Sequence, residues 1–241
     1  MAGLGPATHD LFPTATVSEK DVGGRSKSGQ GVTWSAQGSA RKAGFAPQGS
    51  GGPAAAAAPF ILAFGDSLTA GYGLPRKDAF PAQLEARLRQ EGIKAQVMNA
   101  GVSGDTTASG LWRLRVALAE KPQLVILEEG ANDALRGIPP PVVRANLEKM
   151  IRRIKASGSK LLLAGMLAPS NWGARYAERF DRIYPALARA FHVPLYPFFL
   201  DGVALKPALN QPDGIHPNKK GVATIVRRIA PYVVRLLKEK K

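Results

Sequence analysis

Residues 59–73 have the sequence PFILAFGDSLTAGYG, in which an apolar run ends in a polar turn rich in glycine. The run at 59–64 predicts a buried strand, and the turn places the hydroxyl of Ser67 at the carboxyl end of that strand. Open α/β sheets bind their ligands at this edge. Asp and Ser are also common turn and helix-capping residues, so the turn alone does not establish a nucleophile.

Short apolar runs alternate with amphipathic stretches along the rest of the chain. The runs predict strands at 59–64, 95–98, 124–127, 160–166 and 194–196. The amphipathic stretches predict helices at 79–90, 106–118, 140–156, 174–191 and 217–237. This alternation favours a central parallel sheet covered by helices on both faces, a three-layer α/β/α sandwich.

A serine hydroxyl needs a base within hydrogen-bond reach, and the chain has three histidines. His9 lies in a low-complexity segment. His192 lies at the predicted end of a helix, where a histidine is often structural. His216 is the candidate base, because it opens the last predicted helix and Pro217 fits the first helical position.

Asp213 precedes His216 by three residues, across a glycine that tolerates unusual backbone angles. This spacing lets the Asp213 carboxylate bind one ring nitrogen while the other nitrogen faces Ser67. An ordinary turn with an incidental histidine is the alternative interpretation.

The charge that develops on a substrate carbonyl oxygen needs hydrogen-bond donors. Gly104 lies in the segment GVSGDT at 101–106, between a predicted strand and a helix, and its amide is unobstructed by a side chain. Asn132, in GAND at 130–133, carries an amide that can reach the same point. A plain strand-to-helix turn capped by Asp105 or Thr106, and a turn-forming Asn-Asp pair, are the respective alternatives.

Together these segments resemble the SGNH (GDSL) hydrolase superfamily, and within it the acyl-CoA thioesterase I, lysophospholipase L1 and arylesterase group. The resemblance covers residues 59–240. It rests on GDSL at 65–68, AGYG at 70–73, NAGVSGDT at 99–106, GANDALRG at 130–137 and DGIHPN at 213–218. One departure is Glu129, where relatives usually carry a large apolar residue; a carboxylate there either alters the electrostatic field of the site or faces water.

The resemblance implies a flavodoxin-like sandwich and a metal-independent serine hydrolase without a cofactor. Ser67, His216 and Asp213 would form the catalytic triad. The amides of Ser67 and Gly104 and the side chain of Asn132 would form the oxyanion hole. The substrates would be aryl esters, acyl-CoA thioesters or lysophospholipids.

Side chains that follow these motifs are candidates for an acyl-chain channel. They are Tyr72, Leu74, Leu135, Pro169 and Trp172. Ordinary loop packing is the alternative interpretation of each of them.

Residues 1–58 are rich in Gly, Ser, Ala, Gln and Pro and are expected to form a disordered extension ahead of a hydrolase domain at 59–241. The segment lacks the apolar stretch of a secretory signal. It is therefore either a genuine extension, which fits a cytoplasmic protein, or a mis-assigned start that replaces a signal peptide. The resemblance implies a periplasmic or secreted protein.

The chain has a formal net charge of +15, with basic residues gathered on the predicted helices. Solvated helix faces explain such a charge, and weak attraction to anionic lipid surfaces is the sharper interpretation. No basic and aromatic residues interleave as nucleic-acid binding would require. We expect a monomer with a small acyl substrate.

Two other functions compete with the acyl esterase. A carbohydrate O-acetyl esterase would have the same motifs but fail on long acyl chains. A basic module that binds anionic surfaces without catalysis is disfavoured, because every proposed catalytic position holds a suitable residue. The absence of cysteine and the single histidine with nearby carboxylates argue against a metallohydrolase.

Overall fold

The computed structural model describes residues 58–239, which form a five-stranded parallel sheet with the strand order β2-β1-β3-β4-β5. The expected α/β/α sandwich is confirmed, and this strand order is the flavodoxin-like one. The expectation of a disordered segment at 1–58 falls, except for Ala58, outside the described residues. The strands are β1 (Phe60–Gly65), β2 (Gln96–Gly101), β3 (Leu124–Glu128), β4 (Lys160–Ala164) and β5 (Leu195–Tyr196).

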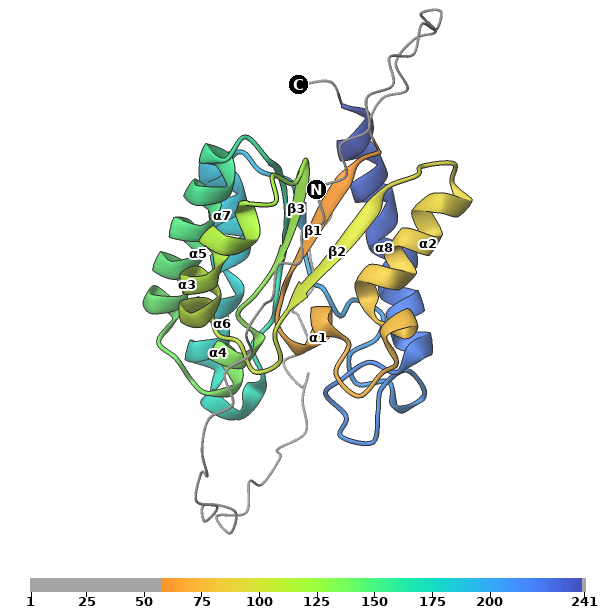
Figure 1. Ribbon diagram of the computed structural model, residues 1–241. Helices are drawn as coiled ribbons and strands as arrows, with labels where there is room; N and C mark the ends of the chain where they lie inside the picture. Colours follow the sequence, from red (N-terminus) through yellow and green to blue (C-terminus); the bar gives the residue numbers. More distant parts are fainter. Residues whose placement is uncertain (1–57, 240–241) are drawn as a thin grey trace, which may run out of the picture. The chain divides into compact units, whose positions relative to one another are not determined.

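Helices cover both faces of this sheet (Figure 1). One layer consists of α2 (Phe80–Gln90) and α8 (Lys219–Lys238). The other layer contains α3 (Thr107–Leu118), α5 (Pro140–Ala156), α6 (Ala174–Asp181) and α7 (Ile183–Phe191). Short helices follow two strands, namely α1 (Ser67–Ala70) after β1 and α4 (Ala131–Leu135) after β3, and 3₁₀ turns lie at Arg76–Asp78, Ser170–Trp172 and Pro207–Leu209. No helix in residues 58–239 is long and apolar enough to cross a membrane.

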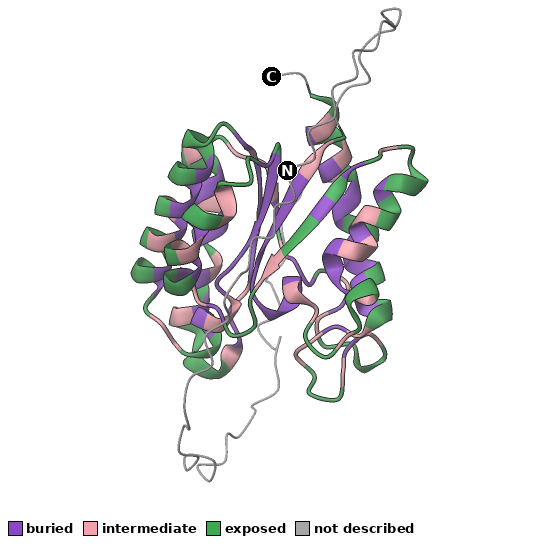
Figure 2. Cartoon of the chain, viewed as in Figure 1, coloured by how far each residue is buried: buried purple, intermediate pink, exposed green. Residues whose placement is uncertain are grey.

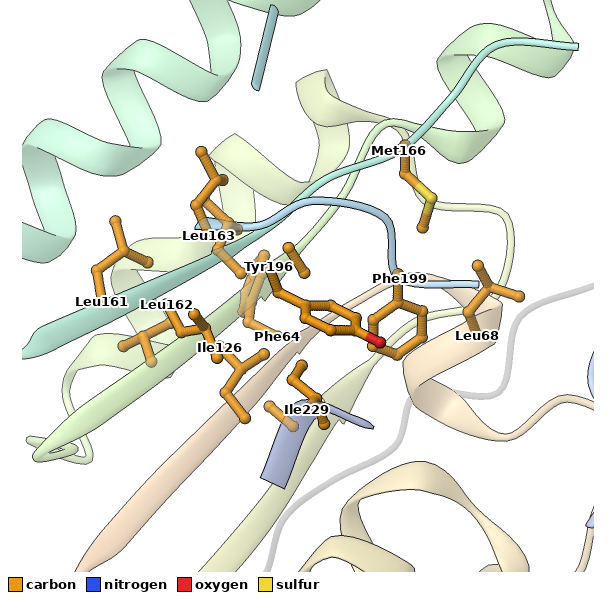
Figure 3. Close-up of a cluster of buried hydrophobic side chains, with 14 of the residues drawn as sticks. Phe64, Leu68, Ile126, Leu161, Leu162, Leu163, Met166, Tyr196, Phe199 and Ile229 are labelled. Carbon is orange, nitrogen blue, oxygen red and sulfur yellow. The ribbon is translucent and has the colours of Figure 1, made fainter. Parts of the chain in front are cut away.

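The core lies between the sheet and the two helical layers. Every residue of β3 is buried, whereas Val97 is the one buried residue of the edge strand β2 (Figure 2). Side chains from β1, β3, β4 and α8 meet around Phe64, Ile126 and Ile229 (Figure 3). Full burial of one such side chain contributes about 1.5–3 kcal/mol, so this core fixes the strand ends that carry the site.

The structure corrects two of the predicted helices. The helix expected at 174–191 is two helices that meet at Arg182. Pro185 explains the break, because proline lacks an amide hydrogen and its ring clashes with the carbonyl of the residue four positions earlier. The last helix begins at Lys219, and Asn218 caps it by accepting from the amides of Lys220 and Gly221, so Pro217 lies outside it.

Candidate active site

Ser67 is the first residue of α1, directly after β1. Asp66 caps this helix, and its buried carboxylate accepts a hydrogen bond from the Leu68 amide at 2.9 Å. Gly65 is required just before it, because a Cβ there would lie 2.4 Å from the carbonyl oxygen of Glu128. The tight packing of this turn fixes where the Ser67 hydroxyl lies.

The structure brings together Ser67, near the start of the domain sequence, and Asp213 and His216, near its end. The Nε2 atom of His216 lies 2.9 Å from the Ser67 Oγ, and its Nδ1 lies 2.8 Å from Asp213 Oδ2. These distances are those of hydrogen bonds, and they join the three side chains in one chain. The ring of Tyr72 lies over His216, with the two centroids 4.6 Å apart, and so limits the positions of the imidazole.

The Asp213 carboxylate is held by its own turn. Its Oδ1 accepts from the amides of Ile215 and His216 at 2.9 and 3.0 Å, and Gly214 adopts a positive φ of +71° that lets the chain fold back. Partial burial alone would raise the pKa of Asp213, but the hydrogen bonds from His216 and Ile215 outweigh it and lower that pKa. Asp213 is therefore an ionised partner for the imidazole at neutral pH.

Asp133 holds the Gly104 and Asn132 segments against each other. Its two carboxylate oxygens accept from the amide and the hydroxyl of Thr107, at 2.8 and 2.7 Å, which ties α4 to the start of α3. Arg136 adds a hydrogen bond of 3.0 Å to the carbonyl oxygen of Gly104. The pair Asn132-Asp133 is therefore not only a turn, because Asp133 also holds α4 against the start of α3.

The three expected oxyanion donors have different surroundings. The Asn132 Nδ2 donates to Asp66 Oδ2 at 3.0 Å, which orients the side chain beside Ser67. Within residues 58–239 the backbone amides of Ser67 and Gly104 have no acceptor. Gly104 has a φ of +83°, a backbone conformation that favours glycine.

A largely apolar pocket of about 110 Å³ opens beside Ser67 and His216. Leu135 and Pro169, both predicted from the sequence, line it. Tyr72 lies on His216 instead, Leu74 packs against the core, and Trp172 packs beneath Gly137. Further lining residues that the sequence reasoning missed are Leu68, Met166, Leu167, Phe198, Leu200 and Ile215. The sequence did carry a signal for Ile215, because an aliphatic side chain stands out in the otherwise polar DGIHPN turn.

Behind the serine turn lies a buried cluster of carboxyl groups. Glu128 accepts from the Thr69 hydroxyl at 2.8 Å and from the Asp66 amide at 3.3 Å. Burial raises the pKa of Asp66 to about 6 and raises that of Glu128 well above its usual value. The cluster is therefore partly protonated at neutral pH.

Glu129 belongs to the same cluster and is fully buried, so the expectation that it could face water is wrong. Burial and the nearby carboxylates of Glu128, Asp66 and Asp105 raise its pKa well above the usual value. Its Oε1 lies 3.4 Å from Arg113, and its Oε2 has no hydrogen-bond partner among the described residues. Burying this carboxyl group with one oxygen unpartnered costs stability.

Arg113 is the only cation that contacts this cluster within residues 58–239. It donates to the Asp105 carboxylate, to the carbonyl oxygen of Ala100 at 2.7 Å and to that of Gly65 at 2.8 Å. It thereby joins the ends of β1 and β2 to α3. In the same part of the chain, no group of three His, Cys, Asp or Glu side chains is placed to hold a metal ion.

Comparison with known proteins identifies the family. The sequence profile of the GDSL-like lipase/acylhydrolase family matches residues 63–223. The chain is 43% identical to Esterase TesA of Pseudomonas aeruginosa over 183 residues, which cover 76% of this chain and 91% of that one. It is 45% identical to Thioesterase 1/protease 1/lysophospholipase L1 of Escherichia coli K12 over 166 residues, which cover 68% and 78% of the two chains.

A solved structure agrees with these sequences. The SGNH-hydrolase family esterase AlinE4 superposes with a TM-score of 0.63 and 46% identity, over 76% of this chain and 98% of its own. The chain therefore belongs to the GDSL-like lipase/acylhydrolase family.

Proposed function

We propose that the protein hydrolyses carboxylic esters or thioesters of acyl chains through a covalent acyl-enzyme on Ser67. The protein is a metal-independent serine esterase of its family. The observation that carries the residue assignment is the continuous hydrogen-bonded chain from Ser67 through His216 to Asp213, at 2.9 and 2.8 Å.

The first half of the reaction forms the acyl-enzyme. His216 Nε2 takes the Ser67 proton as Oγ bonds to the acyl carbon, and the carbonyl π electrons move onto oxygen. The amides of Ser67 and Gly104 and the Asn132 side chain then bind the oxyanion. Asp213 holds the imidazole tautomer and stabilises the imidazolium.

The second half releases the acid. The tetrahedral species collapses, the bond to the alcohol or thiol breaks, and His216 gives its proton to that leaving group. A water molecule then attacks the acyl-enzyme, with His216 again as base, and the carboxylic acid leaves Ser67.

The pocket beside Ser67 supports an acyl-chain substrate. Its walls include Leu68, Met166, Phe198 and Leu200, which favour a hydrocarbon chain over a polar sugar ring. The names of the relatives include an esterase and a thioesterase/lysophospholipase. The candidate substrates are therefore aryl esters, acyl-CoA thioesters and lysophospholipids, ahead of acetylated carbohydrates.

Initial rates on p-nitrophenyl esters from acetate to palmitate test this proposal, with Ser67→Ala as the blank. We expect hydrolysis of medium or long chains that disappears in the variant, followed by activity on acyl-CoA or lysophospholipid. Activity on acetate alone would indicate a deacetylase. A rate that does not depend on Ser67 would contradict the mechanism.

We also infer, from the family resemblance, a periplasmic or secreted location. Cell fractionation with N-terminal sequencing of the native protein tests it. A mature end near residue 58 outside the cytoplasm supports this location, and a cytoplasmic protein that begins at Met1 contradicts it.

A further inference from the structure

The outer surface formed by α3, α5, α6 and α7, which we call the α5 face, exposes large apolar side chains. Trp112 is 86% exposed and Val116 69% exposed, both on α3, and Val142 on α5 is 47% exposed. Trp112 and Val116 lie one helical turn apart on α3, and exposed apolar side chains that cluster mark interaction sites more often than those scattered singly. No large apolar side chain of α2 or α8, on the opposite layer, is exposed in the described chain.

The α5 face is also basic, and most of its cations have no acidic partner. Arg152 pairs with Glu148 and Arg182 with Glu178. Within residues 58–239, no carboxylate pairs with Arg115, Arg144, Lys149, Arg175, Arg179 or Arg189. On the opposite layer a larger share of the basic side chains pairs with carboxylates. Examples are the ion pairs Arg87–Glu91, Arg89–Glu85 and Arg228–Asp201.

Two grooves flank α5 on this face. The groove toward α6 and α7 has a volume of about 770 Å³ and is lined by Arg144, Arg179 and Arg189. The groove toward α3, of about 950 Å³, is lined by Trp112, Val116 and Arg153. Arg144 and Arg153 lie nine residues apart, about two and a half helical turns, which places them on opposite flanks of α5.

The crest of α5 connects the two grooves. Lys149 and Arg152 are exposed at helix positions between the two flanks, and Arg152 lies over the ring of Phe191. The helices α3, α5 and α7 lie on the same side of the sheet, as Figure 1 shows. Cationic and apolar side chains therefore share one continuous surface.

We propose that the α5 face binds membrane surfaces rich in anionic phospholipids. Its arginines contact the headgroup phosphates, and Trp112 and Val116 enter the boundary between headgroups and acyl chains. Tryptophan and basic residues are the side chains that bind this boundary, and each cation adds attraction to an anionic leaflet. Two copies of the chain that meet through their α5 faces are disfavoured, since like charges would face each other.

Vesicle sedimentation tests the proposal with the full chain. We expect binding to vesicles with about a third phosphatidylglycerol and little binding to phosphatidylcholine alone. The triple variant Arg144→Gln/Arg179→Gln/Arg189→Gln should bind roughly 100-fold more weakly, since each cation near an anionic bilayer contributes about fivefold. Its hydrolysis of a soluble p-nitrophenyl ester should be unchanged, because these residues do not contact the pocket.

A charge-matched control separates this face from net charge alone. Lys94→Gln/Arg227→Gln/Lys238→Gln removes three exposed cations elsewhere on the domain and should retain most of the vesicle binding. If this control loses as much affinity as the triple variant, the attraction is nonspecific and the proposal is wrong.

Trp112 tests the apolar half of the proposal. Trp112→Ser should weaken binding by about tenfold, since the buried indole contributes to insertion. In a Trp34→Phe/Trp172→Phe background, the emission of Trp112 should shift to the blue on anionic vesicles. An unshifted emission, or equal binding to duplex DNA that Trp112→Ser does not alter, would overturn membrane binding in favour of a site for soluble polyanions.

Discussion

Asp213 and Glu129 both carry carboxyl groups near the carboxyl ends of the strands, but their burial and their hydrogen bonding are opposite. Asp213 is partly exposed, and its oxygens accept from two amides and from the His216 ring. Glu129 is fully buried, with one oxygen unpartnered within the described chain and Arg113 3.4 Å from the other. The pKa is lowered at Asp213 and raised at Glu129.

This difference separates two regions that adjoin Ser67. In the relay of Ser67, His216 and Asp213, the Asp213 carboxylate stays ionised beside the imidazole that transfers the proton. Every hydrogen bond of this relay is formed. The cluster of Asp66, Glu128 and Glu129 is closed from water and holds protons. Residues of the relay should therefore govern turnover, and Glu129 should govern mainly stability.

Removal of the nucleophile should have the largest effect. Ser67→Ala should lower kcat by about 10⁶-fold, because nucleophile and base act as a unit. Adding His216→Ala should cause little further loss for the same reason. Single-turnover kinetics measure both variants, and additive losses would show that the two residues act independently.

Asp213→Asn should come next, with kcat lower by about 10⁴-fold and the fold intact. The amide keeps the shape of the side chain but removes the negative charge that stabilises the imidazolium. Steady-state kinetics and circular dichroism check this together. An effect below about tenfold would place Asp213 outside the relay.

Loss of one oxyanion donor should have a smaller effect. Asn132→Ala should lower kcat by about 10²–10³-fold with little change in KM, because the donor acts on charge that appears only in the transition state. Asn132→Asp, which keeps the shape but loses the amide donor, should behave alike. Unchanged kcat in both variants would remove Asn132 from the oxyanion hole.

Glu129→Leu should have the smallest effect on activity and should stabilise the fold. The pKa of Glu129 is raised in the folded state, so folding favours the protonated carboxyl group. The contribution of this proton to stability is fully present below the unfolded-state pKa, and it is lost as pH rises through the folded-state pKa. The free energy of unfolding of the variant should therefore increasingly exceed that of the wild type as pH rises above the unfolded-state pKa of glutamate, about 4.3.

Denaturant titrations at several pH values measure this gain, with the exposed Glu120→Leu as the control. A loss of turnover in Glu129→Leu as large as that in Asn132→Ala would break the comparison. It would mean that the buried cluster supports the site electrostatically.

Much of the fold and the candidate site follows from local sequence. The apolar run at 59–64 and the turn at Ser67 predict a strand followed by a serine at its carboxyl end. The spacing of Asp213 and His216 predicts their hydrogen bond, because three residues across Gly214 bring the side chains together. The break at Arg182 was also readable in principle, since Pro185 lies inside the predicted helix.

Other features depend on residues far apart in the chain. The pocket wall joins Leu68, Met166 and Phe198, which follow three different strands. The burial of Glu129 and the joining of β1, β2 and α3 by Arg113 are likewise long-range contacts. No local pattern distinguishes a buried carboxyl from an exposed one after a strand.

Local sequence predicts the succession of strands and helices along the chain and the types of residue at the sheet edge, because periodicity and turn chemistry act over a few residues. The folded arrangement of distant segments sets which side chains meet there, which carboxyl groups lose contact with water, and which helical face carries, within residues 58–239, cations without a carboxylate partner beside Trp112. Those outcomes depend on packing between distant segments, where burial and the neighbouring charges set the energy of each group.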